Sequence, residues 1–152
     1  MTRKELEHVI RAAATIADDD EIVVIGSQAV LGQFPNAPAD LLRSMEADVW
    51  PRNRPERWEL VDGSIGELSP FHETFGYYAQ GVSLSTAVLP SDWQNRLASI
   101  ATPGAAPARA RCLEPHDCVV SKLVAARQGP GVRRGPDPGA PRRARGPALE
   151  DR

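Results

Sequence analysis

The stretch "EIVVIGSQAVLGQF", residues 21–34, combines the patterns of a strand, a tight turn and a helix. Residues 21–25 are a short β-branched run, and Gly26 and Ser27 follow them as a turn pair. Glycine relieves the backbone crowding of such a turn, and the small and apolar residues after it suit a helix. A strand followed at once by a helix predicts a sheet with helices packed on it.

A second strand is predicted from "SMEADVW", residues 44–50, which sets Glu46 and Asp48 one residue apart in a β-prone run. Alternate side chains of a strand share a face, so both carboxylates would point one way and the apolar neighbours the other. Like charges at that distance repel. Water can solvate such a pair, or a divalent cation can bind between the two acids. Both interpretations remain open from these residues alone.

The rest of the chain extends the same architecture. Together with the two strands, the predicted elements give an α/β (α+β) domain in which helices cover a small mixed sheet. These elements are an amphipathic helix at 4–17, a helix from Pro55, two strands in 76–90 with a bend near Gly81, a turn or short helix in 91–101, a strand in 108–115, and a helix at 115–127.

Length and charge limit the class of protein. The chain has 152 residues, which fits one domain, and a formal net charge of -2, which argues against a wholly basic nucleic-acid binder. It contains no apolar run as long as a membrane span requires, and its start has no pattern of a cleaved signal peptide. We therefore expect a cytoplasmic protein that does not associate with a membrane.

Two cysteines and a histidine lie close together in "CLEPHDC", residues 112–118. Cys112, His116 and Cys118 are candidate zinc ligands, but a fourth ligand is missing and their spacing matches no common zinc finger. Two cysteines are also too few for a disulfide framework. We expect both thiols to be reduced and no zinc to be bound.

The composition changes after Arg127. Residues 128–152 are rich in Gly, Pro and Arg and poor in aliphatic side chains, which predicts a disordered tail after a domain at 1–127. A basic tail that binds nucleic acid is one interpretation. A second is a frameshift: when residues 128–149 are back-translated with GC-rich codons and read one base later, permissible codons give "RDRAFVAALIRARLVEPAALLW", an amphipathic helix with a proline stop.

Several of these motifs resemble a known family. "IGSQAVLGQFP", residues 25–35, and "SMEADV", residues 44–49, resemble the nucleotidyltransferase fold, in particular its minimal and abortive-infection-type members, with a Gly-Ser turn, a helix and an acid-x-acid strand. "LEPHDCVVSKLVAAR", residues 113–127, resembles their later helix. "GELSPFHETFGYYAQGV", residues 66–82, is similar to the DUF6036 family of predicted nucleotidyltransferases.

The resemblance implies an activity and a site. Gly26 and Ser27 would hold the phosphates of a nucleoside triphosphate, and Lys122 would add a positive charge toward them. Glu46 and Asp48 would be catalytic and would bind Mg²⁺ or Mn²⁺. The enzyme would then move a nucleoside monophosphate to a hydroxyl of an acceptor, which could be RNA, a protein or a small molecule.

The sequence departs from the family pattern in three ways, the first being a gap between Ser27 and Glu46 that is longer than in the simplest transferases. Glu46 replaces the usual first aspartate, and residues 77–90 lack the third carboxylate that active members usually carry on a later strand. The alternative is therefore a non-catalytic module that binds nucleotide or a partner protein, as in a toxin–antitoxin or phage-defence pair. A damaged gene product without activity is a third interpretation. His72 and Glu73 could be acid–base partners. Alternatively, His72 is a hydrogen-bonded packing residue.

The frameshift hypothesis predicts a gain in stability. A chain with the alternative reading frame after Arg127 should melt several degrees higher than the present chain, because each aliphatic side chain that a new helix buries contributes on the order of 1.5–3 kcal/mol before ordering costs. Resequencing the gene and comparing melting curves of the two chains tests this. Equal melting temperatures and solubilities would mean that the present tail is native.

Overall fold

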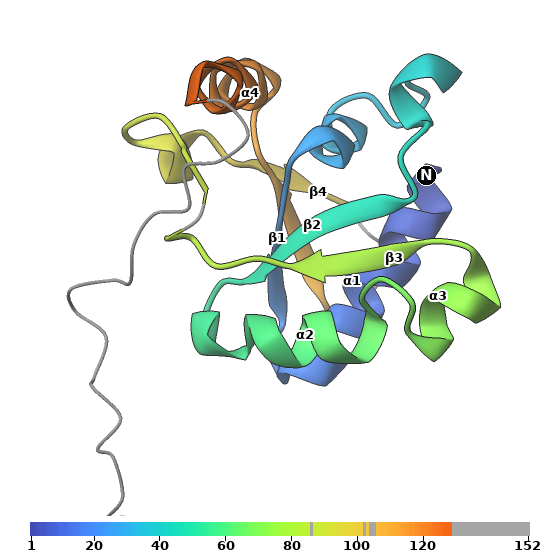
Figure 1. Ribbon diagram of the computed structural model, residues 1–152. Coiled ribbons are helices and arrows are strands. Elements are labelled where there is room, and N and C mark those ends of the chain that lie inside the picture. Colours follow the sequence, from blue (N-terminus) through green and yellow to red (C-terminus); the bar gives the residue numbers. More distant parts are fainter. Residues whose placement is uncertain (86, 102, 104–105, 129–152) are drawn as a thin grey trace, which may run out of the picture.

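A computed structural model describes residues 1–85, 87–101, 103 and 106–128, which form a five-stranded mixed sheet with helices packed on it (Figure 1). This confirms the predicted fold class. The strands are β1 (Glu21–Ile25), β2 (Glu46–Pro51), β3 (Tyr78–Gly81), β4 (Ala98–Ile100) and β5 (Arg109–Cys112). The helices are α1 (Arg3–Ala17), α2 (Trp58–Ile65), α3 (Pro70–Phe75) and α4 (Pro115–Gln128), with 3₁₀ helices η1 (Ser27–Gly32), η2 (Ala39–Leu42), η3 (Pro55–Arg57) and η4 (Trp93–Arg96).

Strand β1 is the centre of the sheet, whose order is β3-β2-β1-β5-β4. It pairs antiparallel with β2 and parallel with β5, and all its residues are buried. Strand β3 lies parallel to β2 at one edge, and β4 lies antiparallel to β5 at the other. Because β1 and β2 run in opposite directions, the carboxyl end of β1 lies beside the amino end of β2. The register pairs Ile25 with Asp48, so the turn after β1 meets the acid pair.

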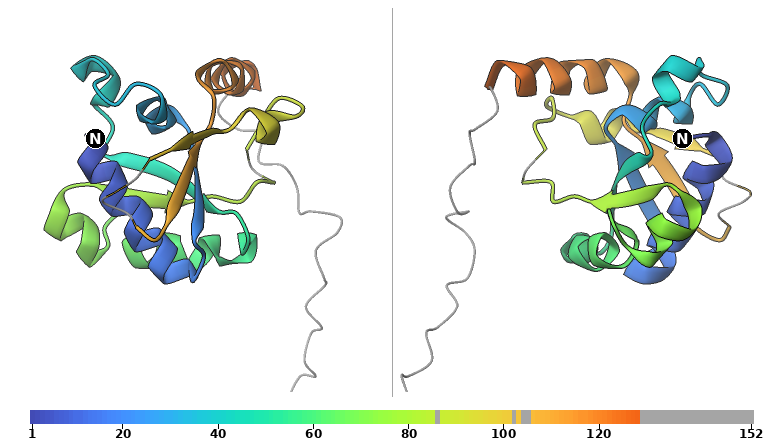
Figure 2. Two further views of the ribbon diagram at one scale, coloured as in Figure 1. Left: turned by 180° about the vertical axis from the view of Figure 1, so that it is seen from behind. Right: turned by 45° about the vertical axis from the view of Figure 1, so that its right-hand side comes forward.

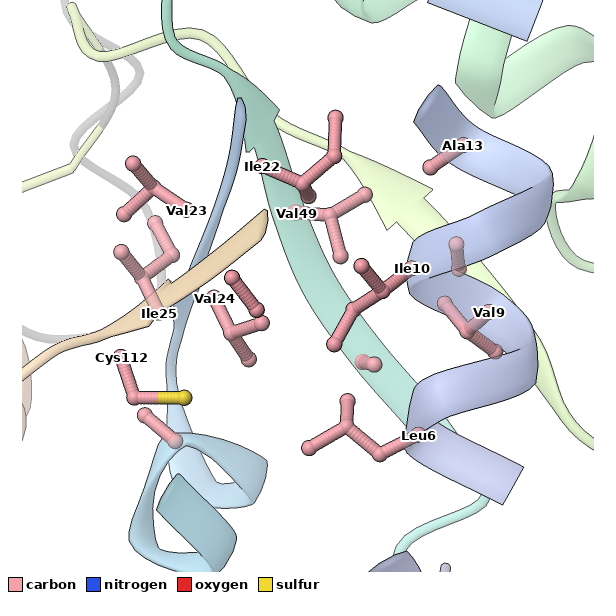
Figure 3. Close-up of a cluster of buried hydrophobic side chains, with 14 of the residues drawn as sticks. Leu6, Val9, Ile10, Ala13, Ile22, Val23, Val24, Ile25, Val49 and Cys112 are labelled. Atoms are coloured by element: carbon pink, nitrogen blue, oxygen red, sulfur yellow. The ribbon is translucent and has the colours of Figure 1, made fainter. Parts of the chain in front are cut away.

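The main core lies between α1 and one face of the sheet. Thr2 and Glu5 form a capping box that fixes the start of α1, and the buried stripe of this helix faces the sheet. Figure 3 shows this contact between Leu6, Val9, Ile10 and Ala13 of the helix and Ile22, Val24 and Val49 of the strands. Burial of side chains of this size contributes about 1.5–3 kcal/mol each, which holds the helix to this face.

Helix α2 packs on the same face as α1, at the end of β3. A Cβ added to Gly81 would lie 2.1 Å from the backbone oxygen of Trp58, so only glycine allows this close approach of strand and helix. Gly81 pairs with Val49 in the sheet, and both therefore face the helices. Glu46 and Asp48 of β2 lie on the opposite face of the sheet.

Three local predictions were wrong in detail. The segment after Gly26 is a 3₁₀ helix, and the described residues of 82–90 form no second strand. Strand β4 lies where a turn or helix was predicted for 91–101, although η4 in the same segment agrees with the prediction. Helix α3 was not predicted; its start is set by Ser69, whose hydroxyl accepts from the backbone N–H of His72, and by Pro70 in the first turn.

The last helix agrees with the prediction for 115–127. Residues 129–152 lie outside the described residues, so the predicted tail and the frameshift remain hypotheses. In the described part of the chain, no helix combines the length and the apolar character that crossing a membrane requires.

Asp19 lies in the connection between α1 and β1 and forms hydrogen bonds with residues that follow β2. It is 5% exposed and accepts hydrogen bonds of 2.7–2.9 Å from the backbone N–H groups of Glu21, Asn53 and Arg54 and from the Asn53 amide. Burial alone would raise the pKa of Asp19, but these hydrogen bonds outweigh it and hold the pKa below its usual value. The ionised carboxylate is therefore part of the folded structure.

Replacing Asp19 should destabilise the fold strongly. We expect Asp19→Ala to lower the free energy of unfolding by about 3 kcal/mol at pH 7, because buried hydrogen bonds to a charged group are lost. Since the folded pKa is depressed, this contribution is present above about pH 4 and is lost as the pH falls through the folded pKa. Urea unfolding at pH 7 and pH 3 measures it.

The neighbouring Asp20 provides the control for this measurement. Its carboxylate forms an exposed ion pair of 3.1 Å with Arg109, so Asp20→Ala should cost less than about 1 kcal/mol. An equal loss in both variants at pH 7 would contradict the role given to Asp19.

Candidate functional site

The turn after β1 lies directly against the acid pair. Gly26 has φ +71°, a conformation that side-chain-bearing residues rarely adopt, and a Cβ added to it would lie 2.1 Å from Oδ2 of Asp48. Any larger residue would push the turn and the carboxylate apart. The glycine therefore allows the backbone of the turn and the Asp48 carboxylate to share one small space.

The two predicted acids lie on one face of β2, as the strand pattern requires, and both are half-buried. Burial, the negative charge of Glu46 and a hydrogen bond with Glu46 raise the pKa of Asp48 to about 7, and the positive charge of Lys122 opposes this rise. The pair therefore holds a proton up to neutral pH. Its electrostatic repulsion is the feature that a bound cation would relieve.

Helix α4 brings Lys122 to the same end of the sheet. Figure 2 shows α4 across the end at which β1 and β5 finish. The Cys118 thiol donates to the Gly26 carbonyl over 3.5 Å, which ties the helix to the turn. Burial raises the pKa of Cys118 to about 11 against the opposing charge of Lys122, so this ammonium acts on both Cys118 and Asp48.

A cavity of about 440 Å³ lies between η1, η2 and α4, and Ser27 and Lys122 both line it. Its volume is within the range of small-molecule sites. Glu46 and Asp48 are not part of its lining, but Asp48 touches Gly26, the residue before Ser27. The five residues predicted for the site thus come from three separate segments and lie around one end of the sheet.

A family comparison assigns the chain to a family. The model of a family described as "Nucleotidyltransferase of unknown function (DUF6036)" matches residues 4–130. The chain belongs to this family. No curated protein and no solved structure matches it. The comparison confirms the family resemblance and carries a nucleotidyltransferase label, without a substrate.

Strand β3 of this DUF6036 domain places two further residues beside the acid pair. Tyr78 pairs with Glu46 and Gln80 pairs with Asp48 in the parallel register, so all four side chains share a face. The Tyr78 hydroxyl donates to Oε2 of Glu46 over 2.7 Å. This hydrogen bond, together with burial and nearby negative charges, raises the pKa of Tyr78 to about 12. Only the register of β2 and β3 identifies these neighbours, because their sequence separation is large.

Gln28 is a further residue that the pattern did not identify. It follows Ser27, its side chain is 1% exposed, and neither its amide nitrogen nor its amide oxygen has a hydrogen-bond partner among the described residues. An unpaired buried amide is costly. Because Gln28 directly follows Ser27, this unpaired amide lies next to the candidate site.

Other candidate groupings are not brought together. Cys112 is buried beneath Gly32, whereas the exposed His116 bonds Glu114 over 2.8 Å. Within the described ranges, no three His, Cys, Asp or Glu residues could hold a metal ion. A cavity of about 630 Å³ lies at the opposite end of β1, next to Asp19, and contains none of the predicted site residues.

His72 is a packing residue in this structure. Its ring lies 4.6 Å from the ring of Tyr78, and its Nδ1 accepts from the backbone N–H of Leu68 over 3.1 Å. Glu73 is exposed. The geometry therefore favours packing over an acid–base pair of His72 and Glu73.

The acid pair should make the stability of the domain fall as the pH rises. The folded pKa of Asp48 is raised from its ordinary value of 3.8 to about 7, so the unfolded state releases this proton first, and stability is lost between these two values. Asp48→Asn removes the charge. We expect it to raise the free energy of unfolding at pH 8 by about 2 kcal/mol, with little effect near pH 4.

Thermal unfolding in EDTA from pH 4 to pH 8 measures this difference. The exposed Glu59 is the control, since Glu59→Gln should give no pH-dependent gain. If Asp48→Asn were no more stable than the natural chain at pH 8, the electrostatic cost assigned to the pair would be wrong.

Proposed function

We propose that this DUF6036 domain is a metal-dependent nucleotidyltransferase that moves a nucleoside monophosphate from a nucleoside triphosphate to an acceptor hydroxyl. The observation that supports it most is the contact of Gly26 with Asp48. This contact places a turn next to an acid pair. The backbone N–H groups and serine hydroxyl of the turn suit phosphate binding, and the acids suit metal binding.

The acid pair fits a hard divalent cation. Mg²⁺ and Mn²⁺ take oxygen ligands, and Mg²⁺ is commonly held by one or two carboxylates together with substrate phosphates and water. Glu46 and Asp48 supply two carboxylates on one face, and their mutual repulsion is the electrostatic condition that a dication relieves. When bound, the ion would be held by Glu46 and Asp48 and would neutralise charge that develops on the transferred group.

The chain's own residues would position the substrate. Ser27 and Lys122 line one cavity, so a hydroxyl donor and a positive charge are available to the phosphates. The acceptor hydroxyl oxygen would attack the α-phosphorus while the bond to the β-phosphate oxygen breaks. Pyrophosphate leaves, and the hydroxyl proton passes to a base. Such a reaction depends mainly on positioning and charge stabilisation.

A second candidate function is binding without transfer. Strand β3 presents the amide of Gln80 beside Asp48, and among the described residues no third His, Cys, Asp or Glu joins the two acids in a group that could hold a metal ion. This observation favours a module that holds a nucleotide or a partner protein, including a partner in a toxin–antitoxin or phage-defence pair. For the transferase, the acceptor would be RNA, a protein or a small molecule.

The decisive experiment separates binding from transfer. Calorimetric titration of a nucleoside triphosphate with Mg²⁺ or Mn²⁺ should show binding to the natural chain, and Glu46→Gln with Asp48→Asn should weaken it at least about tenfold, because neutral amides are poor ligands for hard dications. A matched control changes two exposed acids, Glu56→Gln with Glu59→Gln.

Release of pyrophosphate with labelled triphosphate and mixed RNA and protein acceptors then measures transfer. Binding and transfer that both require the acid pair support the enzyme, whereas binding without transfer supports the second candidate. Equal nucleotide binding by the acid-pair variant and the control would remove Glu46 and Asp48 from the site.

A further inference from the structure

Tyr78 holds the Glu46 carboxylate in a defined place. Its hydroxyl donates to Oε2 of Glu46 over 2.7 Å, while its own backbone N–H donates to the carbonyl of Met45 over 3.0 Å. The tyrosine is 9% exposed, and the parallel register sets it directly beside Glu46. Both ends of the contact are therefore fixed by the sheet.

The ring of Tyr78 is itself supported from α3. The His72 ring lies against it at 4.6 Å, and His72 is fixed by a hydrogen bond from its backbone N–H to the Ser69 hydroxyl and by the Leu68 N–H that donates to its Nδ1. The support thus runs from the cap of α3 through His72 and Tyr78 to Glu46.

This support reduces the rotational freedom of the Glu46 side chain. Glutamate has one more rotatable bond than aspartate, so its carboxylate loses more rotamer freedom when it binds a cation. A hydrogen bond to one carboxylate oxygen removes part of that freedom before binding. Outer hydrogen bonds of this kind orient metal ligands, and their loss typically lowers metal affinity 10- to 100-fold.

We propose that Tyr78 is a positioning residue that orients Glu46 toward the divalent cation. The inference rests on the proposed function, because it assumes that Glu46 is a metal ligand. It adds a residue that acts through Glu46 and does not itself touch the cation or the nucleotide.

The neighbouring tyrosine provides a matched control. The Tyr77 hydroxyl lies 2.8 Å from Nδ1 of His8, so Tyr77→Phe removes a hydroxyl hydrogen bond to α1 and leaves the acid pair untouched. Tyr78→Phe removes the hydroxyl at Glu46 and keeps the ring that packs on His72. The two variants differ in which hydrogen bond they lose.

Mn²⁺ affinity, measured from the electron paramagnetic resonance signal of the free ion with a nucleoside triphosphate present, is the test. We expect Tyr78→Phe to raise the dissociation constant for Mn²⁺ 10- to 100-fold and Tyr77→Phe to change it less than about twofold. In a Glu46→Gln background, Tyr78→Phe should have no further effect, because the group it positions is already gone.

The outcomes separate this inference from the proposed function. If the natural chain binds no Mn²⁺ with the nucleotide, the proposed function and this inference both fail. If it binds and Tyr78→Phe binds equally well, or loses affinity equally in the Glu46→Gln background, Tyr78 has no positioning role and the proposed function stands. Should Tyr78→Phe not fold, Ser69→Ala, which loosens His72, should still weaken Mn²⁺ binding measurably, and an unchanged affinity would overturn the inference.

Discussion

The close approach of the Gly26 backbone to the Asp48 carboxylate is the contact on which the rest of the site depends. It requires a residue without a side chain, a positive φ and an antiparallel neighbour in the register that pairs Ile25 with Asp48. The amino-acid sequence supplies the glycine, the local turn supplies the positive φ, and the sheet topology supplies the antiparallel neighbour. The central position of β1, buried on both faces, keeps this register fixed.

The same contact has an electrostatic cost that the surrounding structure limits. Asp48 is half-buried beside Glu46, which disfavours its charge, and Lys122 compensates only in part. Tyr78 stabilises the negative charge of Glu46 by donating to it. A domain selected only for stability would place apolar or solvated residues here. The acid pair and the unpaired amide of Gln28 therefore support the proposal that this end of the sheet is the functional site, since departures from stable local choices concentrate at such sites.

Much of the site could be predicted from sequence because its main signals are local. The strand at 21–25, the Gly-Ser turn, the alternation of Glu46 and Asp48 and the helix at 115–127 each depend on short-range periodicity. The register of β2 with β3 could not be predicted, because a helical crossover separates Glu46 from Tyr78. The roles of Tyr78 and Gln80 depend on that register. The described residues of 82–90 form no second strand although β3 is an edge strand, so the apolar run there was not enough to predict one.

The position of Lys122 depends on how α4 is anchored. Its first turn is fixed by two hydrogen bonds of 2.9 Å from the Arg96 guanidinium to Asp117 and by the Cys118 thiol at the Gly26 carbonyl. Beyond that turn, Val119, Val120 and Leu123 are 56%, 44% and 61% exposed, so little apolar packing holds the helix. Segments with few buried contacts open at the lowest free-energy cost. Among the described residues, these anchors of α4 lie in its first turn, and Lys122 follows them on the part of the helix that lines the cavity opposite Ser27. A ligand bound in this cavity would contact both the turn after β1 and α4, because residues of both line it.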